Sequence, residues 1–366
     1  MLVVLIQNMK TAYFNSKSFF PLESGEQLNE LTIAYTTLGE RNEDDSNIIW
    51  ICHALTANSD PSEWWEELVG PYKTIDTTQY FVVCANVIGG CYGSTGPLSS
   101  DPETGHPYYH SFPNLTTRDL ANAHELLRKA LKIEKITLGI GGSLGGQQLL
   151  EWNVQHPERF DNLILLATNA KHSPFGIAFN ETQRMAIETD PTWNSSAENA
   201  GLKGLETARA IALLSYRSYA SYSISQTDED QTKRDLFKAG SYQRYQGYKL
   251  RNRFNAFSYF VLSKTMDSHN VGRNRESVES ALRKITAKTL IIGISSDLLF
   301  PVSEQAFLER NIPNSNLVVI GSNYGHDGFL TETERLSAHF CQFLSQVDTN
   351  FELTSQCLEL GYSTAN

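Results

Sequence analysis

One serine, one aspartate and one histidine of this 366-residue chain have the surroundings and the chain order that acyl transfer by a nucleophilic serine requires. Ser143 lies in the segment Gly141–Gly145, GGSLG, which fits the pattern G-x-S-x-G. An apolar run precedes this segment and helix-forming residues follow it, which predicts a sharp strand-to-helix turn. Such a turn leaves little room for Cβ atoms and projects the serine hydroxyl outward, where it can act as a nucleophile.

A base and an acid follow the serine in the order that this chemistry uses. A serine nucleophile needs a general base, and the base needs an acid that orients it. Behind strand–turn–helix nucleophiles the acid comes first along the chain and the histidine last, each in a loop after a strand. Asp297 follows the apolar run Lys288–Ile294, and His326 follows Leu317–Ile320. We therefore predict a catalytic triad of these residues at the carboxyl edge of a sheet.

The oxyanion of an acyl-transfer intermediate also needs two backbone N–H donors. The amide of Leu144, directly after the nucleophile, is the first candidate. The second is expected in the loop after the strand Ile48–Cys52, which points to the amide of Leu55.

Each of these residues also has an interpretation without this chemistry. The serine segment could be a plain glycine-rich turn or a nucleotide-binding turn. The fingerprint G-x-G-x-x-G fails, because Leu144 stands where its third glycine belongs. Asp297 could cap a helix expected at Val302–Arg310, Asp327 could cap the last helix, and His326 could be an ordinary turn histidine. Three placements in the right order favour the triad.

Strands and helices alternate around these residues, which predicts an α/β fold with a mostly parallel sheet flanked by helices. We expect strands at Tyr13–Phe20, Leu28–Leu38, Ile48–Cys52, Tyr80–Ala85, Ile136–Ile140, Asn162–Ala167, Lys288–Ile294 and Leu317–Ile320. Core helices are expected at Ser62–Val69, Thr117–Ala130, Val302–Arg310 and Glu332–Val347, and Asn86–Pro113 reads as a long functional loop.

Between residues 172 and 285 strand-like runs are missing and helical stretches such as Leu205–Tyr222 and Arg253–Lys264 dominate. This region is interpreted as a helical insertion, which we call the lid. The remaining segments, 1–171 and 286–366, are expected to form one core domain.

Composition excludes several classes of protein. The net charge is -11 and long runs of Lys or Arg are missing, which argues against nucleic-acid binding. The sequence has no H-E-x-x-H and no C-x-x-C, so no metal site is expected. Its five cysteines form no disulfide pattern, which favours unpaired thiols in a reducing cytoplasm. The apolar segment Leu2–Ile6 is too short for a signal peptide, and no run reaches membrane-spanning length, so a cytoplasmic protein without membrane contact is expected.

Several longer strings resemble the homoserine O-acetyltransferase family of the α/β-hydrolase superfamily. The resemblance extends in family order from about Phe14 to Leu344, and its most specific string is GGCYGSTGP at Gly89–Pro97. The other matching strings are His53–Thr56, Val69–Pro71, Gly142–Gly146, Glu151–Trp152, Ser215–Ser218, Ser296–Pro301 and Gly325–Leu330.

The resemblance implies an α/β-hydrolase fold with a helical lid and a ping-pong transfer in methionine biosynthesis. Ser143 would take acetyl from acetyl-CoA, a co-substrate, and pass it to the hydroxyl of L-homoserine; no permanently bound cofactor is implied. Arg209 and Tyr216 match residues that hold the homoserine carboxylate, and Asp327 matches the acid that holds its ammonium. The family also implies a homodimer formed through the lid.

Two positions depart from the family and three alternatives stay open. Ala57 stands where glycine is usual, and Leu144 stands where methionine is frequent, but neither change touches the triad. Homoserine O-succinyltransferases and serine O-acetyltransferases belong to the same family, and a few pocket residues decide between them. A serine esterase, with water as the acceptor, is an alternative of another class. A binding protein without catalysis is disfavoured by the intact triad, and without the resemblance Arg209 would be read as a solvated lid arginine.

Overall fold

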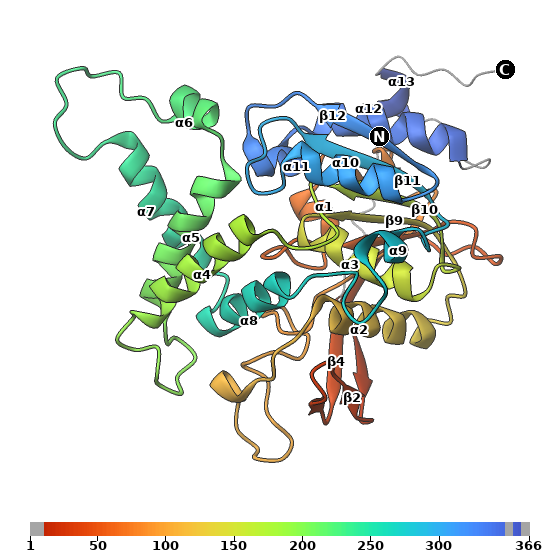
Figure 1. Cartoon of the computed structure of the whole chain (residues 1–366), viewed down its shortest axis with the longest axis horizontal. Coiled ribbons are helices and arrows are strands. Elements are labelled where there is room, and N and C mark those ends of the chain that lie inside the picture. The colour runs from red at the N-terminus through yellow and green to blue at the C-terminus, as the bar shows by residue number, and fades with distance from the viewer. Residues whose placement is uncertain (1–10, 348–353, 360–366) are drawn as a thin grey trace, which may run out of the picture.

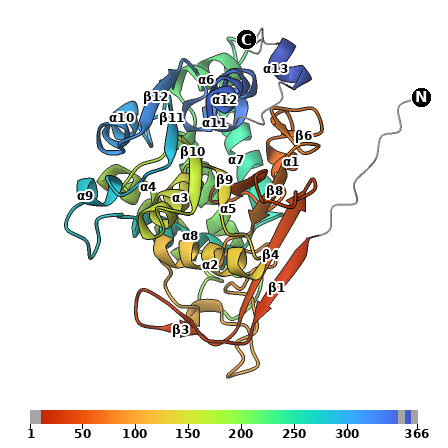
Figure 2. The ribbon, with the colours of Figure 1, turned by 90° about the vertical axis from the view of Figure 1, so that its right-hand side faces the viewer.

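The computed structural model describes residues 11–347 and 354–359, so the apolar segment Leu2–Ile6 lies outside the described residues (Figure 1). Its core is an eight-stranded sheet with the order β1-β4-β8-β5-β9-β10-β11-β12. The strands from β8 to β12 pair in parallel, whereas β1 and β4 are antiparallel additions at one edge (Figure 2). The mostly parallel sheet that the sequence predicts is therefore confirmed.

The strands of the large sheet are β1 (Ala12–Ser16), β4 (Leu31–Leu38), β8 (Phe81–Ala85), β5 (Ile48–Cys52), β9 (Ile136–Gly142), β10 (Phe160–Leu166), β11 (Lys288–Ile294) and β12 (Ser315–Ile320). Two small pairs join β2 (Phe20–Pro21) to β3 (Gln27–Leu28) and β6 (Val69–Gly70) to β7 (Ile75–Asp76). The central strands β5, β9, β10 and β11 are buried along nearly their whole length, as expected for a sheet that helices cover on both faces.

Helices cover both faces of this sheet (Figure 1). One face packs on α2 (Thr117–Ala130), α3 (Leu144–Gln155), α9 (Val278–Leu282) and α10 (Val302–Asn311), in an apolar cluster that contains Trp50 and Trp152. The other face packs on α12 (Thr333–Val347), in a cluster that contains Trp65 and Phe340, with α1 (Pro61–Trp64) beside it. The short turns η2 (Gly325–Asp327) and α11 (Gly328–Thr331) connect β12 to α12, and η1 (Tyr109–Ser111) lies in the long loop after β8.

Between β10 and β11 the chain forms helices α4 to α9 and no strand. Helices α4 (Pro174–Glu188), α5 (Leu202–Tyr216), α6 (Tyr219–Ser225), α7 (Lys238–Arg251) and α8 (Ala256–Asp267) form the layer at the left of Figure 1. Helix α5 packs against α4, α7 and α8, while α9 lies against α3 and α10 of the core. The division of the chain at residues 172 and 285 stays a prediction.

Several predicted boundaries were wrong, each for a local reason. The helix expected at Leu205–Tyr222 is two helices, because Arg217 is extended and the Ser218 hydroxyl caps a new start by accepting from the Ser221 N–H. The helix expected at Ser62–Val69 ends at Trp64, since Val69 enters β6. The expected strands Tyr13–Phe20 and Leu28–Leu38 are each divided in two, and the helix expected at Arg253–Lys264 is α8, capped by Asn255.

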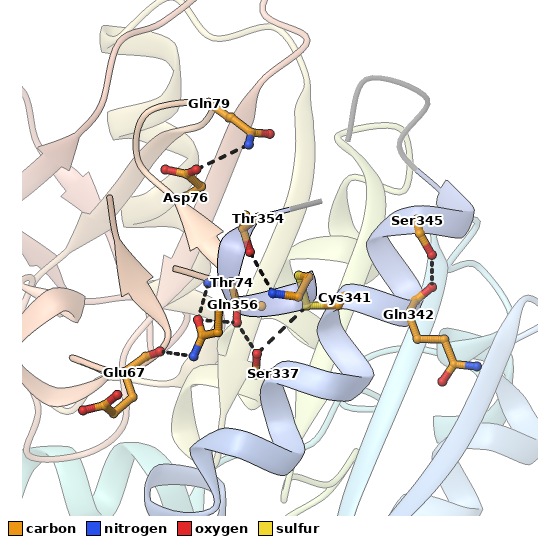
Figure 3. Close-up of a disulfide and its surroundings, with 11 residues drawn as sticks. Glu67, Thr74, Asp76, Gln79, Ser337, Cys341, Gln342, Ser345, Thr354 and Gln356 are labelled. Atoms are coloured by element: carbon orange, nitrogen blue, oxygen red, sulfur yellow. Dashed lines mark hydrogen bonds between the residues drawn. A yellow bond between two sulfur atoms is a disulfide. The ribbon is translucent and has the colours of Figure 1, made fainter. Parts of the chain in front are cut away.

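The expectation of unpaired cysteines is confirmed for Cys52, Cys84 and Cys91 but was wrong for the other two. Cys341 of α12 forms a disulfide with Cys357 of α13 (Ser355–Glu359), as Figure 3 shows. The Gln356 side chain then connects α13 to the core: its oxygen accepts from the Thr74 N–H at 2.7 Å, and its nitrogen donates to the Glu67 carbonyl at 2.9 Å (Figure 3). The pairing depends on α13 lying across α12, which a sequence separation of 16 does not reveal.

In the described ranges, 11–347 and 354–359, none of the helices combines the length and the apolar character needed to cross a membrane.

Candidate active site

The predicted turn at Ser143 is formed by the end of β9 and the start of α3. Ser143 has φ 55° and ψ -125°, a strained conformation for a residue with a side chain. The turn closes so tightly that a Cβ on Gly145 would lie 2.0 Å from the Cys52 carbonyl oxygen, and one on Gly141 would lie 2.5 Å from Gly145. The glycines are therefore required by the close approach of backbone to backbone.

The structure brings the three predicted triad residues into one hydrogen-bonded chain. The Ser143 Oγ and the His326 Nε2 are 2.9 Å apart, and the His326 Nδ1 is 2.7 Å from the Asp297 Oδ2. All three side chains are buried. With Nδ1–H donated to the carboxylate, Nε2 is free to accept the serine proton, which is the arrangement a general base needs.

Asp297 is fixed by its own loop and caps no helix. Its Oδ1 accepts hydrogen bonds from the amides of Leu299 at 2.8 Å and Phe300 at 2.9 Å, which leaves Oδ2 for the histidine. Helix α10 begins after Pro301 without a side-chain cap, and the last long helix begins at Thr333, well beyond Asp327. The capping alternatives for both aspartates are therefore wrong.

The loop after β5 carries Leu55, which lines the same cavity as Ser143, and the hydrogen bonds of His53 fix the peptide before it. The Val87 N–H donates to the His53 Nε2 at 3.1 Å, so the ring proton is on Nδ1, which donates to the Ala54 carbonyl at 2.8 Å. The Ala54 carbonyl and the Leu55 N–H belong to one trans peptide and point in opposite directions. Because the His53 ring holds the Ala54 carbonyl by a hydrogen bond, the Leu55 N–H points away from His53.

The Leu144 amide is the other predicted donor and lies at the start of α3, where the first N–H groups have no partner within the helix. Among the described groups, no hydrogen-bond acceptor is found for the amide of Leu55 or Leu144. Burial lowers the pKa of His53 to about 4, so this ring stays neutral and keeps both of its contacts at neutral pH. In the sequence, His53 was visible only as part of a family string.

A cavity of about 460 Å³ joins the nucleophile to the predicted substrate residues. It is lined by Ser143 and His326 from the core, by Leu55, and by Arg209 and Tyr216 from α5, with Asp327 beside the histidine. The Arg209 guanidinium lies over the Tyr216 ring, 5.4 Å from its centroid, and the Tyr216 ring centroid is 5.7 Å from that of His326. Burial raises the pKa of the Tyr216 hydroxyl, which keeps it a neutral donor.

One charged partner in this region was missed by reasoning from the sequence. The Arg217 Nε lies 2.7 Å from the Asp327 Oδ2, an ion pair whose geometry falls short of a hydrogen bond. Arg217 and Asp327 are distant in the chain and meet because the junction of α5 and α6 packs on the loop that carries His326. The break in the predicted helix at Ser218 was the available signal, since it turns the following chain toward the core.

Aromatic rings pack against the histidine. The Phe300 ring is nearly parallel to the His326 ring at a centroid distance of 5.0 Å, and Phe329 lies 5.2 Å away. Phe300 thus has two roles, because its backbone also donates to Asp297. Neither role of Phe300 was predicted from the sequence, in which this residue was only one position of a family string.

Within the described residues no group of three or more His, Cys, Asp and Glu side chains is arranged to hold a metal ion.

The fold and this site define a class of protein. A family model described as alpha/beta hydrolase fold matches residues 47–333, most of the chain. A serine nucleophile at a strand–turn–helix junction, with its acid and base in later loops, is typical of that fold. The chain is therefore an α/β-hydrolase-fold protein.

Individual relatives narrow the class to one family. A homoserine O-acetyltransferase of Cyclobacterium marinum is 51% identical over 328 residues, which cover 90% of this chain and 93% of that protein. The crystal structure of homoserine O-acetyltransferase from Bacillus anthracis superimposes with a TM-score of 0.87 at 25% identity, over 94% of this chain and 100% of that one. Esterase E22 superimposes with a TM-score of 0.84 over 92% of this chain and 100% of its own, but at 23% identity this likeness concerns the fold alone. The chain belongs to the homoserine O-acetyltransferase family and is an acyltransferase.

Proposed function

We propose that this enzyme moves an acetyl group from acetyl-CoA to the hydroxyl of L-homoserine, by way of an acetyl ester on Ser143. One observation carries the proposal: the cavity that contains Ser143 and His326 also contains Arg209 and Asp327, a cation and an anion. A zwitterionic amino acid needs opposite charges in fixed places, and a guanidinium offers a planar fork to a carboxylate. Water needs neither charge.

In the first half-reaction the Ser143 Oγ attacks the thioester carbonyl while His326 takes the serine proton at Nε2. The negative charge on the carbonyl oxygen is stabilised by the amides of Leu55 and Leu144. The thiolate of CoA leaves with the proton from His326, and the acetyl group stays on the serine. Asp297 holds the histidine in the required tautomer and stabilises its charged form.

In the second half-reaction the acceptor hydroxyl repeats the attack on the acetyl ester. Arg209 and Tyr216 hold the carboxylate, Asp327 holds the ammonium, and His326 removes the hydroxyl proton. Collapse of the second intermediate returns the proton to Ser143 and releases O-acetylhomoserine. This product belongs to methionine biosynthesis, in agreement with the family.

The charge around the cavity supports an anionic donor. Lys249 and Arg253 of the lid line the cavity together with Arg209, and two carboxylates, Glu63 and Asp327, line it as well. The lining of the cavity therefore has a formal charge of +1 in a chain whose net charge is -11. Such a local field attracts the phosphates of a CoA ester more than it attracts a neutral ester. The names of the relatives support acetyl over succinyl, and homoserine over serine.

We also propose a homodimer formed through the lid. Large apolar side chains are exposed on α5, α6, α7 and the loop between the last two: Leu214, Tyr219, Ile224, Leu236, Phe237, Tyr245 and Tyr248. A second copy of the lid would cover this surface. Sedimentation equilibrium of the wild type and of Tyr245→Asp tests the proposal, because an unchanged monomer mass in both would contradict it.

We place the reaction in the cytoplasm, because CoA esters are highly charged and do not cross membranes. The disulfide Cys341–Cys357 is compatible with reducing surroundings, since both cysteines are fully buried and shielded from thiol attack.

Mass spectrometry of purified enzyme with acetyl-CoA or succinyl-CoA, each with homoserine or serine, tests donor and acceptor together. We expect O-acetylhomoserine as the dominant product and one acetyl group on the intact protein before the acceptor is added. Ser143→Ala should remove both signals while circular dichroism stays unchanged. Free acetate as the only product would instead identify an esterase, and succinyl or seryl products would identify the other members of the family.

A further inference from the structure

A second cavity of about 270 Å³ lies where the lid meets the loop that carries His326. Its walls are the junction of α5 and α6, the segment 321–324 after β12, and the start of α12. Its lining includes two guanidinium groups, Arg217 and Arg335, and one carboxylate, Glu332. None of the residues that line it has a part in the transfer described above.

The two arginines leave this cavity with an excess of positive charge. Arg217 uses its Nε for Asp327, and in the described part of the chain neither of its terminal nitrogens is hydrogen-bonded. The Arg335 Nε lies 3.7 Å from the Glu332 Oε2, which is a long contact, and the Arg335 side chain is more than half exposed. Both guanidinium groups thus keep donors available for an oxyanion, which they bind in a planar fork.

The cavity has the size and the polar walls for a small anion. Its volume is about nine times the roughly 30 Å³ that one water occupies in the liquid, so an ion of several heavy atoms fits with part of its hydration. The hydroxyls of Ser221 and Ser225 on α6 and the Asn323 amide also line it. The Ser225 hydroxyl already donates to the Ser221 carbonyl at 2.7 Å, but the Ser221 hydroxyl and the Asn323 amide can donate to further oxygens of a carboxylate or phosphate.

The Arg217–Asp327 ion pair connects this cavity to the catalytic one. Arg217 lines the second cavity and Asp327 lines the cavity that contains Ser143, so the pair spans the wall between them. The same wall is held by Ser218, whose hydroxyl donates to the Asn323 carbonyl. A charge bound next to Arg217 in the second cavity therefore changes the electrostatic potential at the Asp327 carboxylate in the catalytic cavity.

We propose that the second cavity is a binding site for a small oxyanion, a carboxylate or a phosphate, and that its occupation strengthens acceptor binding. An anion beside Arg217 offsets the positive charge that opposes an ammonium at Asp327. The acceptor then binds more tightly, whereas acylation of Ser143, which does not use Asp327, keeps its rate. The coupling rests on the proposed role of Asp327 toward the acceptor, but the binding site does not.

Binding is tested without substrates, by calorimetric titration of inorganic phosphate and, separately, acetate at an ionic strength held constant with chloride. We expect one saturable site per chain for at least one of the two ions, and the stronger ion identifies the ligand class. Arg335→Gln should weaken it at least about tenfold, since one charge-assisted contact is lost. The matched control is Arg310→Gln, which removes the same charge from an exposed position on α10 and should bind like the wild type.

Kinetics test the coupling. With the saturating ion, the KM for the acceptor should fall about fivefold while the rate of acylation stays constant. Fivefold is at the low end for coupled sites, because the cavity is open to solvent. Without the ion, Arg335→Gln should have wild-type activity and should show no fall in KM when the ion is added. Any inhibition that persists in Arg335→Gln belongs to the ion in the catalytic cavity.

Wild-type protein that saturates with neither ion, or Arg335→Gln that binds as tightly as the wild type, would overturn the site. Saturable binding with an unchanged KM for the acceptor would overturn the coupling. If homoserine proves not to be the acceptor while phosphate binding still requires Arg335, the proposed function fails and the site stands. The KM is then followed with the acceptor that the product screen identifies.

Discussion

Replacing Asp297 by asparagine tests the triad at one atom, because the surroundings of this residue fix how the new amide must lie. The Oδ1 position receives two backbone N–H groups, from Leu299 and Phe300, so only an oxygen is tolerated there. The nitrogen of the new side-chain amide therefore takes the Oδ2 position, 2.7 Å from the His326 Nδ1. As a donor, it forces His326 to accept at Nδ1 and to carry its proton on Nε2.

That tautomer cannot remove the serine proton. Nε2, the ring nitrogen 2.9 Å from the Ser143 Oγ, already carries a proton and cannot accept a second one. The stabilisation of the imidazolium by a carboxylate is lost in the same step. By analogy with serine proteases the rate should fall about 10⁴-fold. This fall corresponds to about 5.5 kcal/mol in activation free energy at roughly 1.4 kcal/mol per factor of ten.

The assay is the single-turnover release of CoA from acetyl-CoA, which follows acylation alone and needs no acceptor. Asp327→Asn is the matched control, because the same chemical change is made next to His326 at a residue that pairs with Arg217 instead. We expect the control to acylate within about twofold of the wild type while transfer to the acceptor is impaired. A loss of less than tenfold in Asp297→Asn, or an equal loss in the control, would refute the assignment of Asp297 as the orienting acid.

Three further predictions concern the acceptor, the buried histidines and the disulfide. Arg209→Ala should leave CoA release unchanged and slow O-acetylhomoserine formation by about 2–5 kcal/mol in activation free energy; equal slowing of both steps would assign Arg209 to the donor or to lid stability. Burial lowers the pKa of four histidines to about 3–4, below the 6.5 of a free histidine: His53, His124, His172 and His269. The stability linked to their neutral forms is thus complete above pH 6.5 and is lost as the pH falls toward 4, by up to about 1.4 kcal/mol per pH unit for each histidine. The free energy of unfolding, measured with urea between pH 4.5 and 6.5, should rise with pH at this slope. His124→Asn should reduce the slope by the contribution of one histidine, about 1.4 kcal/mol per pH unit. Cys357→Ser should reduce the free energy of unfolding by about 3 kcal/mol for a closed loop of this length; a strong reductant should produce the same change in the wild type and none in the variant.

Local patterns predicted the elements that carry the nucleophile and the sheet. Helix α2 has the predicted bounds because Thr116 and Asp119 form a capping box that is readable in the sequence. Strands β5 and β11 also have the predicted bounds, since their apolar runs end abruptly at polar loops. The order of Ser143, Asp297 and His326 was readable because each follows such a run.

Contacts between distant segments were not readable in the same way. The disulfide of Cys341 requires α13 to lie on α12, and the role of His53 requires the Val87 amide to face its ring. Neither depends on spacing along the chain. The break between α5 and α6 was missed because no Gly or Pro marks it in the sequence; Arg217 is extended and Ser218 caps the next helix.

Arg217 changes how the charges in the acceptor site should be weighed. Arg209 and Asp327 alone would match the two ends of a zwitterion with no excess charge. Because Arg217 lies against Asp327, its positive charge offsets part of the attraction of Asp327 for the ammonium of the acceptor, whereas the attraction of Arg209 for the carboxylate keeps its strength. Contact with Arg209 should therefore contribute more to acceptor affinity than contact with Asp327. The carboxyl end of the acceptor is thus the end that this site discriminates best, and the arginine behind the acid is the reason.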